Sequence, residues 1–464
     1  MHPFIITYAT MEGSFEKKRE GERIVEKFFK LNEKGSNVKT ELIAGLTTFL
    51  AMAYILGVNP AVLADAGMDK ASVFLATAIS AGVASIIMGL VANYPVALAS
   101  GMGVNALFAY TICGQMGFSW AAALSAVFIS GIIFILISVT GVRKAIINAI
   151  PVQLKLAIGA GIGFFIAFVG LKNAGIIVAS PATFVTIGNL TDPTVLLAIV
   201  GLLITIALVI KNVPAAVFVG MVITAVIGII LGFMGMAGMP TLPEHFISFD
   251  FELQAAGACF SGISELFANP FQAFVVIFSF LFVDFFDTAG TLVAIGNRIG
   301  LINDKGELEN AEQALLADAV GTVFGAVLGT STVTSFVESS SGVGGRTGLT
   351  ACTSGVCFLL AVFLSPLILS TVTNAVTAPA LIVVGIMMAQ QLKGIDWDDM
   401  IFAAAGFVTV IMMILMYSIS NGIACGFIVY TIAMIAAGKA KEVHPTVWAL
   451  MIIFVLYFAT PYIM

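Results

Sequence analysis

Long apolar stretches, separated by short polar connections, fill the chain from residue 41 almost to its end. Most run for about 20 residues without the alternation of a half-buried strand, which is the length at which a helix crosses a ~30 Å hydrocarbon core. We expect about fourteen such segments in two series of seven. The first series covers residues 41–58, 72–92, 102–116, 119–140, 152–171, 193–211 and 213–235. The second covers residues 270–296, 312–329, 337–345, 348–369, 375–392, 399–418 and 421–437.

Because seven is odd, the two series would cross the membrane in opposite directions, as in the inverted repeats of secondary transporters. The third segment of each series is short and follows an extended run, Pro95–Ser100 in one half and Thr330–Phe336 in the other. Alternating β-branched residues in the second run favour a strand. We therefore predict an all-α polytopic membrane protein, a 7+7 inverted repeat with two short strand-helix segments.

Composition supports a protein surrounded by lipid. The 464 residues are 60% hydrophobic and 10% charged, with a mean hydropathy of +1.09, whereas soluble domains are about 45–50% apolar. The lipid bilayer is therefore an expected partner and nucleic acid is not. The five cysteines lie in or beside apolar segments without metal-ligand spacing, so we expect neither a metal nor a cofactor.

The positions of Lys and Arg predict the orientation. Cytoplasmic connections of membrane proteins carry an excess of both, and a cytoplasmic N-terminus puts most of them on that side. These are Arg143, Lys144, Lys211, Arg298, Lys305, Arg346, Lys393, Lys439 and Lys441. Residues 236–268 contain no Lys or Arg, which suits an external connection. We expect a multi-pass protein of the cell membrane whose residues 1–39 form a cytoplasmic tail, with an amphipathic helix near residues 14–31.

Candidate chemistry lies in the few acids placed within apolar segments. Asp284 and Asp287 lie in FLFVDFFDTAG, residues 280–290, and ionisable groups at such depth are costly and usually functional. Glu338 would lie where the second strand-like run meets its short half-helix. Asp318 lies about two turns, or ~10 Å, into its segment, so we expect it to face cytoplasmic water.

The matching place in the first half carries Asn105, with Gly101 and Gly103 allowing close approach of a ligand. We expect both half-helix starts to converge with Asp284 near the middle of the membrane. No Lys, Arg or His lies at comparable depth, which disfavours an anionic substrate. Carboxylates accept hydrogen bonds, so a neutral molecule rich in N–H donors fits. A substrate that donates to a carboxylate favours its charged form, which links substrate and proton occupancy.

Several separated stretches resemble the azaguanine-type purine permeases of the nucleobase:cation symporter-2 family. They are TELIAGLTTFLAMAYI (40–55), PVALASGMGVNALFAY (95–110), FVDFFDTAGTL (282–292) and the stretch around Glu338. The resemblance extends over about residues 38–440. It implies fourteen segments, proton-coupled uptake of hypoxanthine, guanine or adenine, elevator-like movement and a homodimer.

The resemblance also implies two domains. The core domain comprises residues 40–140 and 269–370, and the gate domain residues 141–235 and 371–438; the external connection is 236–268 and a C-terminal apolar extension is 439–464. Whether the extension spans the membrane stays open.

The resemblance assigns roles to individual residues. Asp284 and Glu338 become the principal base-binding acids, with Asn105, Gly103 and Ser339 as further substrate contacts. Asp287, Thr288 and Asp318 become proton-linked or supporting residues. An Asp at position 284 and Glu-Ser-Ser at 338–340 depart from the uracil and xanthine branch, which favours a purine.

Other interpretations stay open. Asp287 could be a structural acid satisfied by Thr288 or Thr291, and transport could use sodium or accept uracil or xanthine. An intramembrane aspartyl protease would take its two aspartates from separate helices, whereas both lie here in VDFFD. A channel would show charged rings or carbonyl filters. We therefore expect a carrier and not an enzyme.

Overall fold

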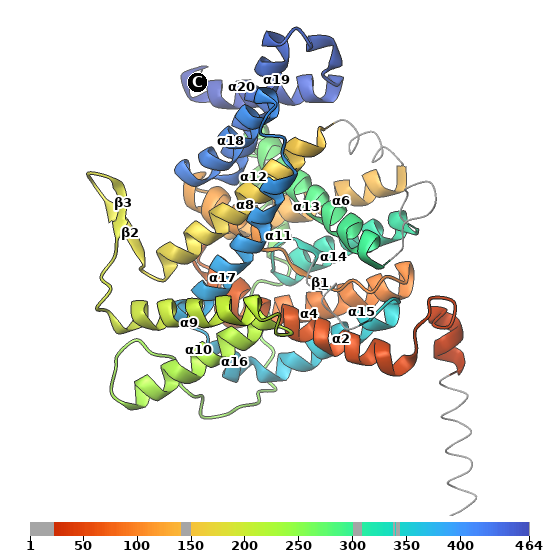
Figure 1. The fold of residues 1–464 in the computed structure, drawn as a ribbon, viewed down its shortest axis with the longest axis vertical. Coiled ribbons are helices and arrows are strands. Elements are labelled where there is room, and N and C mark those ends of the chain that lie inside the picture. The colour runs from red at the N-terminus through yellow and green to blue at the C-terminus, as the bar shows by residue number, and fades with distance from the viewer. Residues whose placement is uncertain (1–22, 141–149, 300–308, 337–338, 340–343, 464) are drawn as a thin grey trace, which may run out of the picture.

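The computed structural model describes residues 23–140, 150–299, 309–336, 339 and 344–463. Within these residues the chain forms a bundle of helices with two short pairs of antiparallel strands (Figure 1). Ten helices are long and apolar enough to cross a membrane in the described part of the chain. Shorter apolar helices cover Pro270–Phe285, Met400–Leu415 and Pro445–Leu456. The predicted helical, multi-pass architecture is confirmed.

The helices and strands follow the expected segments closely. In the first half they are α2 (Val38–Met52), α3 (Ile55–Ala64), α4 (Lys70–Ile87), η1 (Met88–Ala92), β1 (Leu98–Ser100), α5 (Met102–Ala106), η2 (Leu107–Gln115), α6 (Trp120–Thr140), α8 (Val152–Asn173), β2 (Ile177–Ser180), β3 (Phe184–Ile187), α9 (Pro193–Ile210) and α10 (Ala216–Phe233). The connection holds two single-turn helices, α11 (Ala258–Ser261) and α12 (Ile263–Leu266).

The second half repeats the pattern. Its elements are α13 (Pro270–Ile299), α14 (Ala311–Leu328), β4 (Val333–Ser335), α15 (Gly348–Ala361), η4 (Val362–Leu364), α16 (Ser365–Thr371), α17 (Asn374–Ala389), η5 (Gln390–Gly394), α18 (Met400–Leu415), α19 (Ile419–Ala436), η6 (Ala440–Glu442) and α20 (Pro445–Ile463). The segment expected at 337–345 falls mostly outside the described residues.

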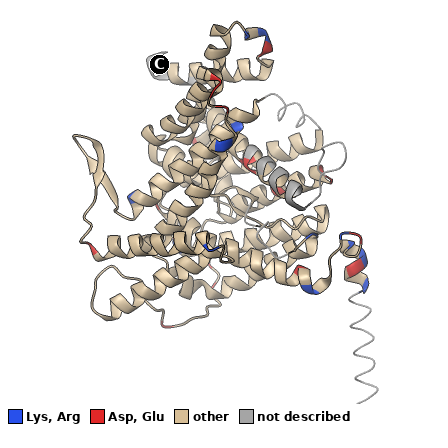
Figure 2. Ribbon diagram, viewed as in Figure 1, with Lys and Arg blue, Asp and Glu red and all other residues tan. Residues whose placement is uncertain are grey.

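Polar caps fix where several membrane helices begin. Asn37, Asp69, Asp192 and Asp399 precede α2, α4, α9 and α18, and each side chain accepts a backbone N–H at 2.8–3.0 Å. Such caps satisfy amide groups that a helix start leaves without a partner. Charged residues accordingly gather near helix ends and connections (Figure 2).

The two halves are interleaved rather than set side by side. α15 packs on α2 and α4, α14 on α4 and α6, and α17 on α8. Glycines allow the closest crossings: a Cβ at Gly385 of α17 would lie 2.4 Å from the Gly163 oxygen of α8. A Cβ at Gly355 of α15 would lie 2.6 Å from the Gly82 oxygen of α4. Small residues at crossings are typical of packed membrane helices.

The two strand-like runs pair with each other. β1 and β4 are antiparallel, with Leu98 opposite Ser335, Ala99 opposite Thr334 and Ser100 opposite Val333. This pairing confirms the extended conformation predicted for both runs, and α5 is the short half-helix predicted after the first. The second half-helix falls mostly outside the described residues. It also brings the start of α5 beside β4.

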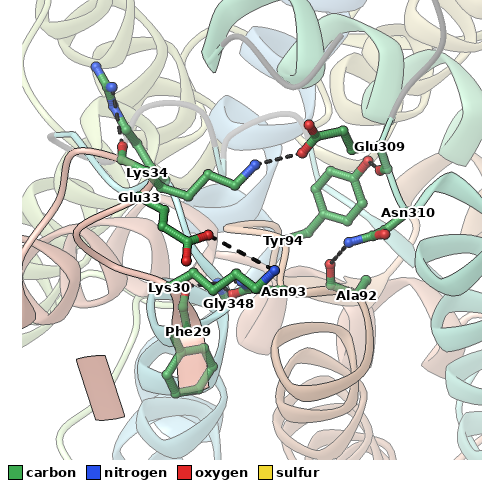
Figure 3. A network of polar contacts seen from close by, with 11 residues as sticks. Phe29, Lys30, Glu33, Lys34, Ala92, Asn93, Tyr94, Glu309, Asn310 and Gly348 are labelled. Carbon is green, nitrogen blue, oxygen red and sulfur yellow. Dashed lines mark hydrogen bonds and ion pairs between the residues drawn. The ribbon is translucent and has the colours of Figure 1, made fainter. Parts of the chain in front are cut away.

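Two features lie at the surface: a hairpin that was not expected, and an N-terminal helix that falls within the amphipathic helix expected near residues 14–31. The hairpin β2–β3 projects from the bundle (Figure 1), and the ring of Phe184 at its turn is 89% exposed. Residues 23–29 are helical, and the segment that follows them is fastened to the bundle (Figure 3). Lys34 Nζ lies 2.6 Å from Glu309 Oε2, and Asn93 Nδ2 donates to the Phe29 oxygen at 3.0 Å.

Candidate functional site

Asp284 is the most enclosed acid of α13. Its side chain is 1% exposed, and Oδ2 accepts a hydrogen bond from Thr322 Oγ1 of α14 at 3.2 Å. Oδ1 has no hydrogen-bond partner among the described residues. A buried acceptor without a partner costs about 1–3 kcal/mol, so this oxygen is a candidate for binding a donor.

Asp318 lies beside Asp284 and is fully buried. The expectation that it faces cytoplasmic water is therefore wrong. Thr288 Oγ1 of α13 donates to its Oδ2 at 2.9 Å, and Ser335 Oγ of β4 donates to its Oδ1 at 3.4 Å. These neighbours cover the carboxyl group even though it lies only two turns from the start of α14.

Hydroxyl groups link Asp318 to Asp287. Thr288 Oγ1 and Thr334 Oγ1 are 2.8 Å apart, and Thr334 Oγ1 donates to Asp287 Oδ2 at 3.4 Å. Asp287 and Asp318 both interact electrostatically with Asp284. Neither Asp284 nor Asp318 takes part in an ion pair between described residues. The result is a group of three acids in which Thr288 and Thr334 link Asp287 to Asp318, and the buried Asp284 interacts with both electrostatically.

Asn105 occupies the first-half position of the site. It is fully buried on α5, and its Oδ1 accepts a hydrogen bond from Ser331 Oγ. Its Nδ2 has no partner within the described part of the chain. One turn further on, the Phe108 ring lies 6.2 Å from that of Phe280 on α13. Because Asp284 is one turn beyond Phe280, the helices carrying Asn105 and Asp284 run past each other here.

Gly103 lies against α8. A Cβ at this position would lie 2.7 Å from Ile162 Cγ2, so in this conformation the space beside Gly103 is filled by protein. Ser339 is bonded to the residue that precedes β1: its Oγ accepts a hydrogen bond from the backbone N–H of Ala97 at 3.0 Å. Glu338 lies outside the described residues.

The sequence analysis did not identify several polar residues around the paired strands β1 and β4. Asn59 Nδ2 donates to Thr77 Oγ1 at 2.7 Å and to Thr330 Oγ1 at 2.9 Å. Ser100 Oγ lies 2.8 Å from Thr330 Oγ1. The dense hydroxyls of TSTVTS, residues 330–335, were the available signal, because such side chains in lipid need partners.

Glu41 was also missed. It is fully buried in the first turn of α2, where its Oε1 accepts the Arg346 N–H at 2.9 Å and its Oε2 the Thr350 hydroxyl at 2.6 Å. The carboxylate thus fixes the start of α15. A position at the end of an apolar segment is typical of a solvated acid, so the sequence pattern does not mark Glu41.

The described residues include no cluster of three or more His, Cys, Asp or Glu arranged to hold a metal ion. The site instead offers carboxylate acceptors, an amide donor and hydroxyls that serve as either. That donor and acceptor set suits a small polar molecule.

Comparison with known proteins decides the family. The model of a family described as the permease family matches residues 39–425. This chain belongs to that permease family. The guanine/hypoxanthine permease PbuG of Bacillus subtilis strain 168 is 50% identical to this permease over 447 residues, covering 93% of this chain and 98% of the relative. The adenine permease AdeP of Escherichia coli K12 is 43% identical over 438 residues, covering 94% and 96%.

A solved structure shares the fold of this permease. The transmembrane domain of a cyanobacterial bicarbonate transporter, BicA, matches with a TM-score of 0.59 at 16% identity, covering 83% of this chain and 96% of that one. This likeness concerns the fold alone. The likeness agrees with the helical, multi-pass fold, to which the predicted 7+7 repeat fits. Membership of the permease family shows a permease and not an enzyme.

Proposed function

We propose that this permease takes up purine nucleobases across the cell membrane together with protons. The observation that carries the proposal is Asp284, a fully enclosed carboxyl group with one oxygen lacking a partner in the described structure. The names of the relatives, a guanine/hypoxanthine permease and an adenine permease, support a purine as the substrate.

A purine base matches the chemistry of the site. Its ring N–H groups would donate to the free Asp284 oxygen, and its ring nitrogen or carbonyl oxygen would accept from the Asn105 amide. Glu338, Ser339 and Gly103 are proposed to complete the contacts. Charge-assisted bonds to a carboxylate are roughly twice as strong as neutral ones, so Asp284 would contribute most.

The acid group supports coupling to protons. Asp284, Asp287 and Asp318 interact electrostatically, so adding or removing one proton changes the energy of the others. A base that donates to Asp284 favours its charged form. The hydroxyl groups of Thr288 and Thr334 can keep their hydrogen bonds to Asp318 and Asp287 when the protonation state of these acids changes.

The proposed movement is of the core domain, residues 40–140 and 269–370, against the gate domain, residues 141–235 and 371–438. The packing of α14 and α15 on α4, and of α17 and α18 on α8, supports these two groups. The distribution of Lys and Arg supports a cytoplasmic N-terminus.

Uptake into proteoliposomes tests the proposal. Purified protein should accumulate labelled hypoxanthine, guanine or adenine when the outside is made acidic, and collapse of the pH gradient should stop accumulation. Asp284→Asn should lower uptake by at least about ten-fold, since a charged hydrogen bond contributes ~1.5–3 kcal/mol. Asp250→Asn, an exposed acid in the connection, is the matched control.

Two results would contradict it. Full uptake by Asp284→Asn would remove the proposed binding acid. Uptake that depends on a sodium gradient and not on the pH gradient would show that sodium, and not the proton, is the coupling ion.

A further inference from the structure

A polar cavity lies away from the buried acids. It has a volume of about 340 Å³ and is lined chiefly by Asp65, Tyr110, Gln115, Lys172, Asn173 and Tyr417. These residues come from the end of α3, from η2, from the end of α8 and from the connection between α18 and α19. Neither Asp284 nor Asp318 lines it.

The lining side chains hold one another in fixed positions. Tyr110 donates its hydroxyl hydrogen to Asp65 Oδ2 at 2.8 Å and accepts from Asn173 Nδ2 at 3.2 Å. Lys172 Nζ donates to the Tyr417 hydroxyl at 3.3 Å and lies 5.1 Å from the centre of that ring. The cavity walls are therefore organised before any ligand arrives.

The chemistry of the walls is that of a site for a planar, neutral, hydrogen-bonding molecule. Asp65 supplies an acceptor, Lys172 a donor, and Gln115 an amide that provides both. One carboxylate and one ammonium group give the cavity no net charge. The Tyr417 ring is partly exposed in the cavity wall and offers a surface on which a heteroaromatic ring can stack. The Tyr110 ring, 5.6 Å away between centres, is buried. Its volume falls within the usual range for small-molecule sites, about 300–1,000 Å³.

The cavity is connected to the buried site by a single stretch of helix. Tyr110 on η2 follows Asn105 on α5 by five residues, which corresponds to about 7 Å of helix. Tyr110 and Asp65 belong to the proposed core domain, whereas Lys172, Asn173 and Tyr417 belong to the proposed gate domain. A ligand in the cavity would therefore touch both.

We propose that this cavity is a peripheral binding site for the free purine base, occupied before the base reaches Asp284 and Asn105. The inference rests on the proposed function, because it takes the same class of molecule as its ligand. The base stacks on Tyr417, donates to Asp65 and accepts from Lys172 or Gln115. By charge distribution the site lies on the outer side of the membrane.

Binding of hypoxanthine to purified full-length protein tests the proposal. Saturation-transfer NMR detects weak binding, and Asp284→Asn removes the principal contact of the buried site. Asp284→Asn should keep a residual hypoxanthine signal. Adding Tyr417→Leu should weaken that residual binding at least about ten-fold, whereas Tyr417→Phe, which keeps the ring, should change it less than about three-fold. Asp65→Asn, at an exposed position, should also weaken it without disturbing the fold.

The outcomes separate this inference from the proposed function. Absence of hypoxanthine, guanine and adenine binding and uptake in the unmodified protein overturns both. Normal uptake and binding in the unmodified protein, with no residual signal in Asp284→Asn, overturns only the peripheral site. So does equal residual binding in the Leu and Phe variants.

Discussion

Hydroxyl groups are the described partners of the buried acids Asp284 and Asp318. A hydroxyl can donate to a carboxylate and can also accept from a protonated carboxyl group. Thr322 and Thr288 therefore keep a hydrogen bond to Asp284 and Asp318 in either state. A lysine or arginine in their place would favour the ionised state alone. These hydroxyl partners suit the proposed proton coupling, in which the acids would gain and lose a proton.

Replacing Thr288 with Val tests the role of a single hydroxyl group in transport. The substitution keeps the shape of the side chain but removes the donor to Asp318 Oδ2 and the contact with Thr334. We expect hypoxanthine uptake to fall about ten-fold, since hydrogen bonds to charged groups contribute ~1.5–3 kcal/mol. The measurement is the initial uptake rate across a series of external pH values, where the profile should shift as well.

Thr431→Val provides the control. Thr431 is equally buried, and its hydroxyl donates to the Phe427 oxygen of its own helix at 2.8 Å. It should change uptake less than about two-fold. An unchanged rate and pH profile in Thr288→Val would rule out a part for this hydroxyl in transport.

Single residues also mark the limits of prediction from sequence. The enclosure of Asp284 followed from its place in the middle of an apolar segment. The burial of Asp318 did not, because it depends on Ser335 and Thr288, which are 17 and 30 residues away along the chain. Depth along a helix does not say which neighbour covers a side chain. Glu41 was missed for the same reason.

At the level of elements, close crossings depend on glycine. α8 and α17 are the fifth segments of the two halves, and they cross where Gly163 meets Gly385. Gly385→Ala places a Cβ 2.4 Å from the Gly163 oxygen and 2.7 Å from Ala167 Cβ. Overpacking of this kind typically costs about 1–3 kcal/mol. We expect a lower midpoint of thermal unfolding in detergent.

Gly406→Ala on α18 is the matched control. It brings the same gain in helix propensity, about 1 kcal/mol, but its Cβ would lie no closer than 3.4 Å to its neighbours. Its unfolding midpoint should stay the same or rise. An equal midpoint for the two variants would show that the crossing tolerates a wider separation.

Elements differ in how well the sequence predicts them. The β-branched run of β4 predicted a strand, and the half-helix pattern predicted its counterpart β1, which pairs with it. The hairpin β2–β3 was not anticipated, although its strands Ile177–Ser180 and Phe184–Ile187 are similarly rich in β-branched residues. It packs little of its surface against the bundle, so no apolar alternation marked it.

For the whole molecule, the proposed movement of core against gate can be tested by cross-linking. An ideal Cβ on Gly103 lies 3.9 Å from Ile162 Cβ, and one on Gly406 lies 3.7 Å from Ala157 Cβ. Both distances match the ~3.8 Å that separates the two Cβ atoms of a disulfide. The first pair joins core to gate, whereas the second lies within the gate. The variant Gly103→Cys/Ile162→Cys is made in a protein whose five native cysteines are replaced. Oxidation, which forms the disulfide, should stop its uptake, and a reductant should restore uptake.

The gate pair, Ala157→Cys/Gly406→Cys, should keep its uptake when oxidised. Each reduced variant is its own reference, so effects of the substitutions themselves cancel. Continued uptake through a fully formed Gly103–Ile162 bridge would exclude relative movement at this contact.

The pairing of β1 with β4 has a consequence for how the protein is made. Asn105 and Ser331, joined by a hydrogen bond, are 226 residues apart in the chain. At about 5–20 residues per second, the ribosome needs roughly 11–45 s to make that stretch. During this interval Ser100 and Asn105 are already in the membrane but lack their native partners from the second half. The site can thus form only after much of the second half has been made, and a nascent chain that stops after the first half contains none of its acids.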